Sequence, residues 1–474
     1  MQKIYGGPRL RRLREERGIT QLALARMLEL SASYVNQIEN DQRPLTMPVL
    51  LKIGAAFDID PQFFAADSDA RLAADVNEVL AESGAAPTAA AISELIARMP
   101  DVGRTLVTLH RRLHAATEQL EQYGEHIAAP TPQELAVPMP FEDVRDFFYD
   151  RRNHIAELDN AAEEMFAENH LQLGSLDTQL ANILLRDHRI SVSIRTDAPE
   201  DPGPKRVYNA AARTLTLSRR LTSGQRAFQL ATQLAFLTQR DTIDAQVAKA
   251  PQLTAPNSRD LARIGLANYF AGALVLPYTK FLDAAERVRY DIELLAVQFN
   301  VGFETVCHRL STLQRPNRRG VPFFFVRIDR AGNISKRQSA TAFHFSRVGG
   351  SCPLWVVHDA FATPGRIRRQ IAQMPDGRTY LWIACTTEDG GHGFRAPERT
   401  FAVGLGCALT HASRLVYSDG LQIDNPAVTV PIGAGCKVCE RPSCAQRAFP
   451  QIGRGVAVDV DVSSRLPYPP QLQE

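Results

Sequence analysis

The 474-residue sequence has no apolar run of the roughly 18 residues that a membrane-spanning helix needs. Its first residues are polar and basic and contain no apolar signal-peptide core. The lack of both features argues against contact with a membrane and predicts a cytoplasmic protein. Because a chain of this length exceeds what one hydrophobic core usually organises, we expect several domains.

The chain also lacks a large excess of charge of one sign, since its formal net charge is only +2. The charge is unevenly spread, because residues 1–57 hold nine Lys and Arg against five Asp and Glu. A basic end on a nearly neutral protein is typical of a surface that binds phosphates. A solvated basic helix without a ligand would give the same pattern, so charge alone leaves both interpretations open.

The N-terminal segment has the apolar spacing of four short helices. Thr20 and Ser31 are residue types that cap helix N-termini, here of helices over 21–29 and 32–40. The residues of the first of these helices that we expect to face inward are Leu22, Ala25 and Leu28. The last helix is expected to close the core with Leu50, Leu51, Ile53 and Phe57.

The outward face of the helix over 32–40 is small or polar, which suits a recognition helix in the major groove. Its candidate base-contacting residues are Ala32, Ser33, Asn36 and Gln37. Four further side chains are placed for the phosphate backbone, namely Gln21, Tyr34, Asn40 and Arg43. One recognition helix reads only a few base pairs, so we expect a homodimer on a double-stranded DNA operator.

The run ITQLALARMLELSASYVNQIENDQRPLT, over residues 19–46, resembles the XRE-type (Cro/C1-type) helix-turn-helix. The matching features are the Gln that opens the second helix, the Ser cap of the third and the Ile-Glu pair at its end. The resemblance implies sequence-specific DNA binding. The alternative is a small helical bundle that binds protein.

Residues 225–286 resemble the zinc-peptidase-like (IrrE-like) domain. In that domain a helix carries His-Glu-x-x-His, because residues four apart share a helix face and can both bind zinc. The corresponding positions here are Thr232, Gln233 and Phe236, and Leu266 stands where an acidic ligand is expected. Phe and Leu cannot bind zinc, so we expect a degenerate domain without hydrolytic activity, with either an effector pocket or a filled core instead. The rival is a metallopeptidase that cleaves a partner protein.

Cysteine is scarce, but three of the seven residues are clustered as Cys436, Cys439 and Cys444. Three thiolates at this spacing can bind zinc or an iron–sulfur cluster, and each usually needs a fourth ligand. Our first candidate for the fourth ligand is Cys407, because its flanking glycines would let the backbone approach a cluster. Cys352 is the second candidate and, for zinc, His411 the third. The alternative is a set of redox-active or buried thiols without metal.

From residue 140 to 450 the sequence resembles the short-chain fatty acyl transcriptional regulators of actinobacteria (RamB/PrpR type). The resemblance rests on HRLSTLQRP (308–316), GNISKRQSATAFHFS (332–346), IAQMPDGR (371–378), VGLGC (403–407), IGAGCKVCER (432–441) and CAQRAFP (444–450). It implies a repressor or activator of acetate or propionate genes, in the glyoxylate or methylcitrate pathways. It also implies an acyl-CoA or CoA effector and a [4Fe–4S] cluster in preference to structural zinc. Lys336, Arg337 and Arg378 lie within these motifs and could meet effector phosphates, or could simply be exposed charges at strand ends.

Together these observations predict a multidomain α+β protein that is not an enzyme. We expect an all-α helix-turn-helix domain over 1–65 and a helical linker over 66–140. A helical, degenerate peptidase-like sensor domain is expected over 141–315. A strand-rich C-terminal domain with a cysteine-bound metal is expected over 316–474. A purely redox-sensing transcription factor is the remaining alternative.

Overall fold

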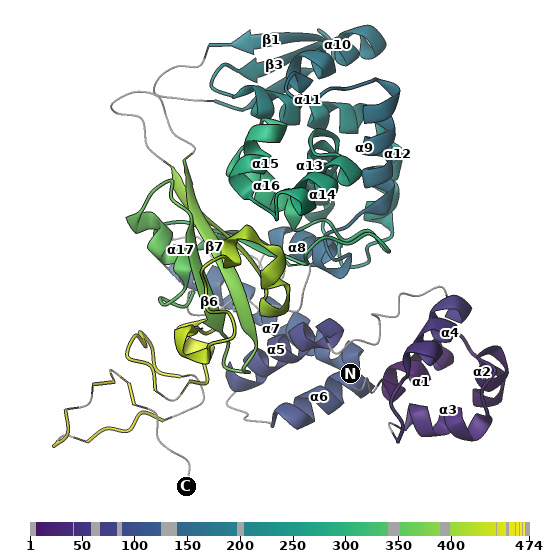
Figure 1. Cartoon of the computed structure of the whole chain (residues 1–474), viewed down its shortest axis with the longest axis vertical. Coiled ribbons are helices and arrows are strands. Elements are labelled where there is room, and N and C mark those ends of the chain that lie inside the picture. The colour runs from purple at the N-terminus through teal and green to yellow at the C-terminus, as the bar shows by residue number, and fades with distance from the viewer. Residues whose placement is uncertain are drawn as a thin grey trace. The chain divides into compact units, whose positions relative to one another are not determined.

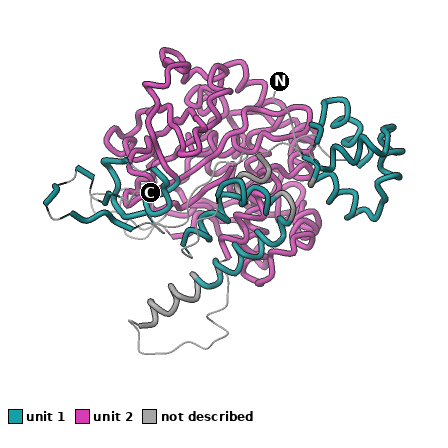
Figure 2. The backbone as a smooth tube through the Cα atoms, turned by 90° about the horizontal axis from the view of Figure 1, so that it is seen from below, with its two compact units in different colours: residues 1–137, 341–349, 434–474 teal, residues 138–340, 350–433 magenta. Residues whose placement is uncertain are grey.

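The computed structural model describes residues 6–40, 42–57, 67–82, 88–124, 140–196, 203–339, 351–388, 399–441, 443–451, 455–459, 461–463, 465–466 and 468–469. Within these ranges the side chains of residues 8, 16, 67–71, 97–98, 111 and 114–124 lie outside the description. The chain forms two compact units (Figure 2). Unit 1 comprises residues 1–137, 341–349 and 434–474, and unit 2 comprises residues 138–340 and 350–433.

Unit 1 begins with four helices (Figure 1), which are α1 (Gly7–Glu16), α2 (Gln21–Met27), α3 (Ala32–Glu39) and α4 (Met47–Phe57). They enclose a core of their own, formed by Leu10, Leu13, Leu24, Ala25, Leu28, Val35, Ile38, Leu45, Val49, Leu50, Ile53 and Phe57. Two expected core residues, Leu22 and Leu51, are instead more than half exposed. On α2 the buried face runs through Leu24 and Ala25, so Leu22 lies on the opposite side of the helix.

Three further helices of unit 1 have a second small core. They are α5 (Asp67–Glu82), α6 (Ala89–Arg98) and α7 (Pro100–Gly124). Their shared buried residues are Val76, Val79, Ile92, Ile96 and Val107. Gly103 of α7 lies so close to α6 that an added Cβ would be 2.6 Å from the end of the Ile96 side chain. The predicted helical linker is therefore a packed three-helix element.

Unit 2 starts with nine helices around a small sheet. The helices are α8 (Pro140–Asp150), α9 (Ala156–Glu168), α10 (Leu176–His188), α11 (Ser223–Thr238), α12 (Arg240–Ala248), α13 (Pro256–Val275), α14 (Tyr278–Arg287), α15 (Ile292–Phe299) and α16 (Phe303–Leu310). The sheet has the order β1-β3-β2, from β1 (Ser191–Arg195), β3 (Thr214–Ser218) and β2 (Arg206–Asn209). β1 runs parallel to β3, and β2 runs antiparallel to it.

A six-stranded sheet forms the rest of unit 2, in the order β5-β4-β8-β7-β6-β9. Its strands are β4 (Phe324–Ile328), β5 (Ile334–Ser339), β6 (Arg368–Gln373), β7 (Thr379–Glu388), β8 (Thr400–Ala408) and β9 (Val430–Pro431). All neighbours are antiparallel except β6 and β9. The short helix α17 (Val356–Asp359) packs on β6, β7 and β8.

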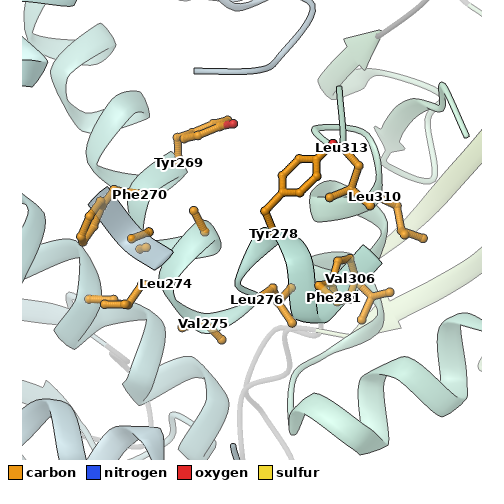
Figure 3. Close-up of a cluster of buried hydrophobic side chains, with 14 of the residues drawn as sticks. Tyr269, Phe270, Leu274, Val275, Leu276, Tyr278, Phe281, Val306, Leu310 and Leu313 are labelled. Carbon is orange, nitrogen blue, oxygen red and sulfur yellow. The ribbon is translucent and has the colours of Figure 1, made fainter. Parts of the chain in front are cut away.

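One hydrophobic core runs through the helices and the large sheet of unit 2. Figure 3 shows part of it, including Tyr278, Phe281 and Leu310. The same core contains Leu313 before the predicted boundary at 315/316 and Val321 after it. That boundary therefore lies inside one packed unit. The cysteine segment, predicted to belong with the strands, groups with unit 1 instead. Among the described helices, none is long and apolar enough to cross a membrane.

Candidate nucleic-acid interface and cysteine loop

The recognition helix α3 starts at a well-formed cap. The Ser31 hydroxyl accepts a hydrogen bond from the Tyr34 backbone N–H at 3.1 Å, and Thr20 caps α2 in the same way through Ala23, at 3.2 Å. Val35 and Ile38 are buried. Ala32, Ser33 and Asn36 are exposed, and Tyr34 and Gln37 are half-buried. The outward face predicted from the sequence is therefore presented by a helix anchored at its start and along its inner side.

A buried carboxylate, Glu39, fixes α3 to the two preceding helices. It accepts hydrogen bonds from Arg14 of α1, at 2.7 and 3.1 Å, and from the Gln21 side chain of α2, at 3.0 Å. The hydrogen bond with Glu39 raises the pKa of the Arg14 guanidinium above its usual value. Gln21 was predicted to contact phosphate, but in this structure its amide is used to hold Glu39. The only sequence signal for Glu39 was the Ile-Glu pair of the family resemblance.

Asn36 and Gln37, both predicted to read bases, differ in what their amides already bind. The Asn36 side-chain oxygen accepts from Gln21 at 3.3 Å and from Asn40 at 3.0 Å. An amide oxygen has two lone pairs, so neither is left for the adenine amino group that a bidentate contact requires. Among the described residues, Gln37 has no side-chain hydrogen bond. Gln37 is therefore the better prepared base-reading residue.

The residues placed for phosphates lie at the end of α3 and just beyond it. The Arg43 guanidinium lies 5.4 Å from the centre of the Tyr34 ring, and Arg43 is exposed. The Asn40 side-chain oxygen accepts a hydrogen bond from exposed Arg11 at 2.6 Å. Arg11, which sequence reasoning did not single out, brings a further positive charge to this edge of the domain.

The former peptidase site is filled. Thr232 and Gln233 on α11 are almost completely buried, and Leu266 on α13 is fully buried. The Thr232 hydroxyl donates to the Phe228 carbonyl oxygen one turn earlier, at 2.8 Å. The Phe236 ring lies 5.6 Å from the Arg206 guanidinium. Of the two alternatives from the sequence, these positions match the filled core.

The HRLSTLQRP motif supplies buried structural contacts. Arg309 donates to the fully buried Asp159 carboxylate at 2.6 Å. Tyr269 and His154 bind the other oxygen of Asp159, at 2.7 and 3.0 Å. Burial alone would raise the pKa of Asp159, but the charge of Arg309 and the hydrogen bond from His154 bring it down to about 2. The motif thereby ties α16 to α9 and α13.

The three residues predicted to meet effector phosphates do not form one site. Lys336 and Arg337 are neighbours on edge strand β5, so their side chains point to opposite faces of the sheet. Arg378 lies in the turn between β6 and β7, with β4 and β8 between it and β5, and binds Asp376 at 2.7 Å. Burial lowers the pKa of Lys336 to about 8, although nearby Glu304 opposes the shift. The sequence motifs brought these cations together only in the linear chain.

The cysteine loop is organised around a buried arginine. Cys436 and Cys439 are buried, and Cys444 is half-buried. The Arg447 guanidinium donates to the Cys436 and Cys439 carbonyl oxygens, at 3.0 Å each, and to the Arg441 carbonyl oxygen at 2.7 Å. Burial raises the pKa of the Cys439 thiol, and the charge of Arg447 opposes this shift. Sequence reasoning missed Arg447, which stood only within the quoted family motif CAQRAFP.

The first candidate for a fourth ligand, Cys407, is buried in the apolar core of unit 2. Burial raises the pKa of its thiol to about 12. Its neighbouring glycines do not serve a cluster in this structure, because a Cβ on Gly406 would lie 2.8 Å from the Trp382 ring. This environment does not support Cys407 as a ligand. Cys352 is also buried, and burial lowers the pKa of the half-buried His411.

No metal site is preformed in the part of the chain that the structure describes. There, no three His, Cys, Asp or Glu side chains are grouped closely enough to hold a metal ion. The donor set of the cysteine loop nonetheless fits a thiolate-bound metal in its chemistry, with three thiols on one short loop and a guanidinium beside them. Ligation would require the loop to draw its three thiols together, as metal-coupled folding does.

Comparisons with known proteins agree with this architecture. A helix-turn-helix family model matches residues 10–64, and an IrrE N-terminal-like domain matches residues 187–311. A model described as "short-chain fatty acyl coenzyme A regulator, C-terminal" matches residues 312–468. A solved structure of a Mycobacterium tuberculosis transcriptional regulator matches at 61% identity and a TM-score of 0.67, covering 70% of this chain and 100% of that one.

Several full-length relatives carry functional names. The chain is 59% identical to the HTH-type transcriptional regulator PrpR of Mycobacterium tuberculosis, over 98% of this chain and 96% of that protein. It is 48% identical to RamB of the same organism, over 99% of each chain. It is 40% identical to the propionyl-CoA carboxylase regulator of Cereibacter sphaeroides, over 98% of this chain and 99% of that protein. The chain therefore belongs to the family of helix-turn-helix transcriptional regulators that includes PrpR and RamB, and it is a regulator rather than an enzyme.

Proposed function

We propose that this chain binds a specific DNA operator through α3 and controls genes of acetate or propionate metabolism. The observation that carries operator binding is the anchored recognition helix, in which Gln37 points its amide outward without a partner among the described residues. The metabolic assignment is supported by the family of short-chain fatty acyl coenzyme A regulators and by the named role of the Cereibacter sphaeroides relative. The gene set corresponds to the glyoxylate or methylcitrate pathway.

Operator binding is tested by selecting bound sequences from random DNA and then measuring affinities for the selected site. Gln37→Ala should weaken specific binding by about 1–3 kcal/mol and relax the base preference at one position. Lys52→Ala is the matched control, because Lys52 lies on α4 and already binds Glu29 at 2.8 Å. Unchanged affinity and preference in Gln37→Ala would show that α3 does not read bases in the proposed register.

The effector of this regulator is proposed to be an acyl-CoA or CoA. The support is the description of the family that covers residues 312–468. Acetyl-CoA, propionyl-CoA and free CoA should each be tested for their effect on operator affinity and on thermal stability. Arg378→Ala and Lys336→Ala are measured separately, because the two side chains lie in different parts of the sheet. An effector that changes neither quantity in the wild type would contradict the proposal.

The cysteine loop is proposed to hold a [4Fe–4S] cluster, with structural zinc as the alternative. Cys436, Cys439 and Cys444 would be the ligands, and the cluster would make the loop sensitive to oxidants. Arg447 would keep the loop backbone in place, since it binds two of the cysteine carbonyls. Two units of this kind then act together as one regulator, because the operator-binding form is proposed to be a homodimer.

The metal is identified on anaerobically purified protein by its visible absorption and by iron and zinc analysis. A brown protein that bleaches in air is expected, and Ser substitution of any of the three loop cysteines should remove most of the iron. Cys307→Ser and Cys385→Ser are the controls, because both thiols are buried elsewhere in unit 2. Cys407→Ser and Cys352→Ser decide the fourth ligand. A colourless protein with one zinc per chain would replace the cluster by a zinc site.

A further inference from the structure

Helix α7 carries an apolar stripe on its exposed side. Val102, Leu109 and Leu113 are 51%, 56% and 65% exposed, and Met99 just before the helix is 52% exposed. The neighbouring face of α7 is buried against α5 and α6 through Gly103 and Val107. The stripe is therefore additional to the face that holds the three-helix element together. Soluble proteins seldom expose several large apolar side chains in one line without covering them.

The spacing of the stripe is that of a coiled-coil seam. Apolar residues recur at alternating steps of four and three, at Val102, Leu106, Leu109, Leu113, Ala116, Leu120 and Tyr123. This is an unbroken a/d pattern over three heptads, and α7 is long enough to present it because it runs from Pro100 to Gly124. The exposed members are Val102, Leu109 and Leu113, while Leu106 also packs towards the small core.

We infer that the α7 stripe is the surface through which two copies of this chain pair. A heptad seam is completed by another helix with the same repeat, and a two-fold axis places the same stripe of a second copy there. No seam position holds a charged residue, so the occupant must be apolar and cannot be nucleic acid. The stripe also lies in the same compact unit as the helix-turn-helix domain. This inference extends the proposed function, since a dimeric regulator reads two half-sites.

The inference is tested on the full chain by mass measurement in solution, without DNA. The wild type should have twice the mass of one chain, and Val102→Glu/Leu109→Glu should have the mass of one chain. The matched control is Leu261→Glu/Ile264→Glu, which places two acids at an exposed apolar pair on α13 that is not part of a heptad repeat. This control should remain a dimer. Far-ultraviolet circular dichroism should show the same helix content in all three proteins.

DNA binding supplies a second readout. The Val102→Glu/Leu109→Glu protein should bind a single half-site as tightly as the wild type and lose at least tenfold in affinity on the two-half-site operator. A loss of half-site binding by the wild type itself would count against operator recognition, and would leave the mass measurement to decide the interface. A dimeric Val102→Glu/Leu109→Glu protein overturns the inference, as it would if residues 125–139 of the same chain or another surface covered the stripe or joined the copies.

Discussion

The buried ion pair between Asp159 and Arg309 should be the most sensitive point of unit 2. The Asp159 side chain is fully buried and that of Arg309 is 3% exposed. Arg309 also donates to the Leu276 carbonyl oxygen at 3.0 Å and to the Thr312 hydroxyl at 3.0 Å. Asp159→Asn keeps the size of the side chain and removes its charge. The guanidinium then remains buried with only neutral partners.

The magnitude follows from that uncompensated charge. Removing one partner of a buried pair costs about 3–5 kcal/mol, a large part of a typical stability of about 5–15 kcal/mol. The shift of the Asp159 pKa from 3.8 to about 2 corresponds to about 2 kcal/mol of this loss. The remainder arises because Arg309 stays desolvated. Urea unfolding followed by tryptophan fluorescence reports on unit 2 alone, because Trp355 and Trp382 are the only two tryptophans and both lie there.

The pH dependence gives an independent check with a definite sign. A carboxyl whose pKa is lowered by folding stabilises the folded state above its ordinary pKa and loses this effect as pH falls towards the folded value. The stability difference between wild type and Asp159→Asn should therefore be complete above about pH 4 and shrink towards pH 2. Asp283→Asn, which breaks the exposed pair with Arg318, is the control. Equal stability losses in Asp159→Asn and Asp283→Asn would refute the reasoning.

Three further outcomes are expected. Arg43→Ala should weaken binding to all DNA sequences alike and reduce the slope of log affinity against log salt by about 1, because an exposed phosphate contact is lost. Gly406→Ala should lower the thermal midpoint of unit 2 at a cost of about 1–3 kcal/mol, since the added methyl meets the Trp382 ring, and an unchanged midpoint would contradict the packing. Restoring the peptidase motif by Thr232→His/Gln233→Glu/Phe236→His should destabilise α11 without creating zinc binding in metal analysis, because buried Leu266 supplies no third ligand.

The sequence predicted local features best. Thr20 and Ser31 cap α2 and α3 as expected, because a hydroxyl one residue before an apolar helical pattern has few other local roles. The left-handed turn after α1 also falls at Gly18, with a φ of 65°. Leu22 was misplaced because its periodicity fits two neighbouring faces of a helix of only seven residues. Leu24 and Ala25 occupy the buried face there.

Contacts between distant residues could not be predicted from the pattern of one sequence. Arg309 meets Asp159 across 150 positions, and Arg14 meets Glu39 across 25. Each of these residues looks like an ordinary solvated charge in its local segment. The same limit explains the effector candidates, because Lys336, Arg337 and Arg378 share motifs but not a surface.

The filled peptidase site bears on how such a scaffold stays folded without its metal. In a zinc peptidase, ligands from two helices are joined through the ion, which ties those helices together. Here α11 and α13 meet through buried Thr232 and fully buried Leu266, so apolar packing takes over that role. The remaining charged contacts of α13 lie at its other face, where Tyr269 binds the carboxylate of Asp159. The polar cluster that once served catalysis in this fold is thus separated from the buried polar cluster that now holds it, and only the second needs its charges.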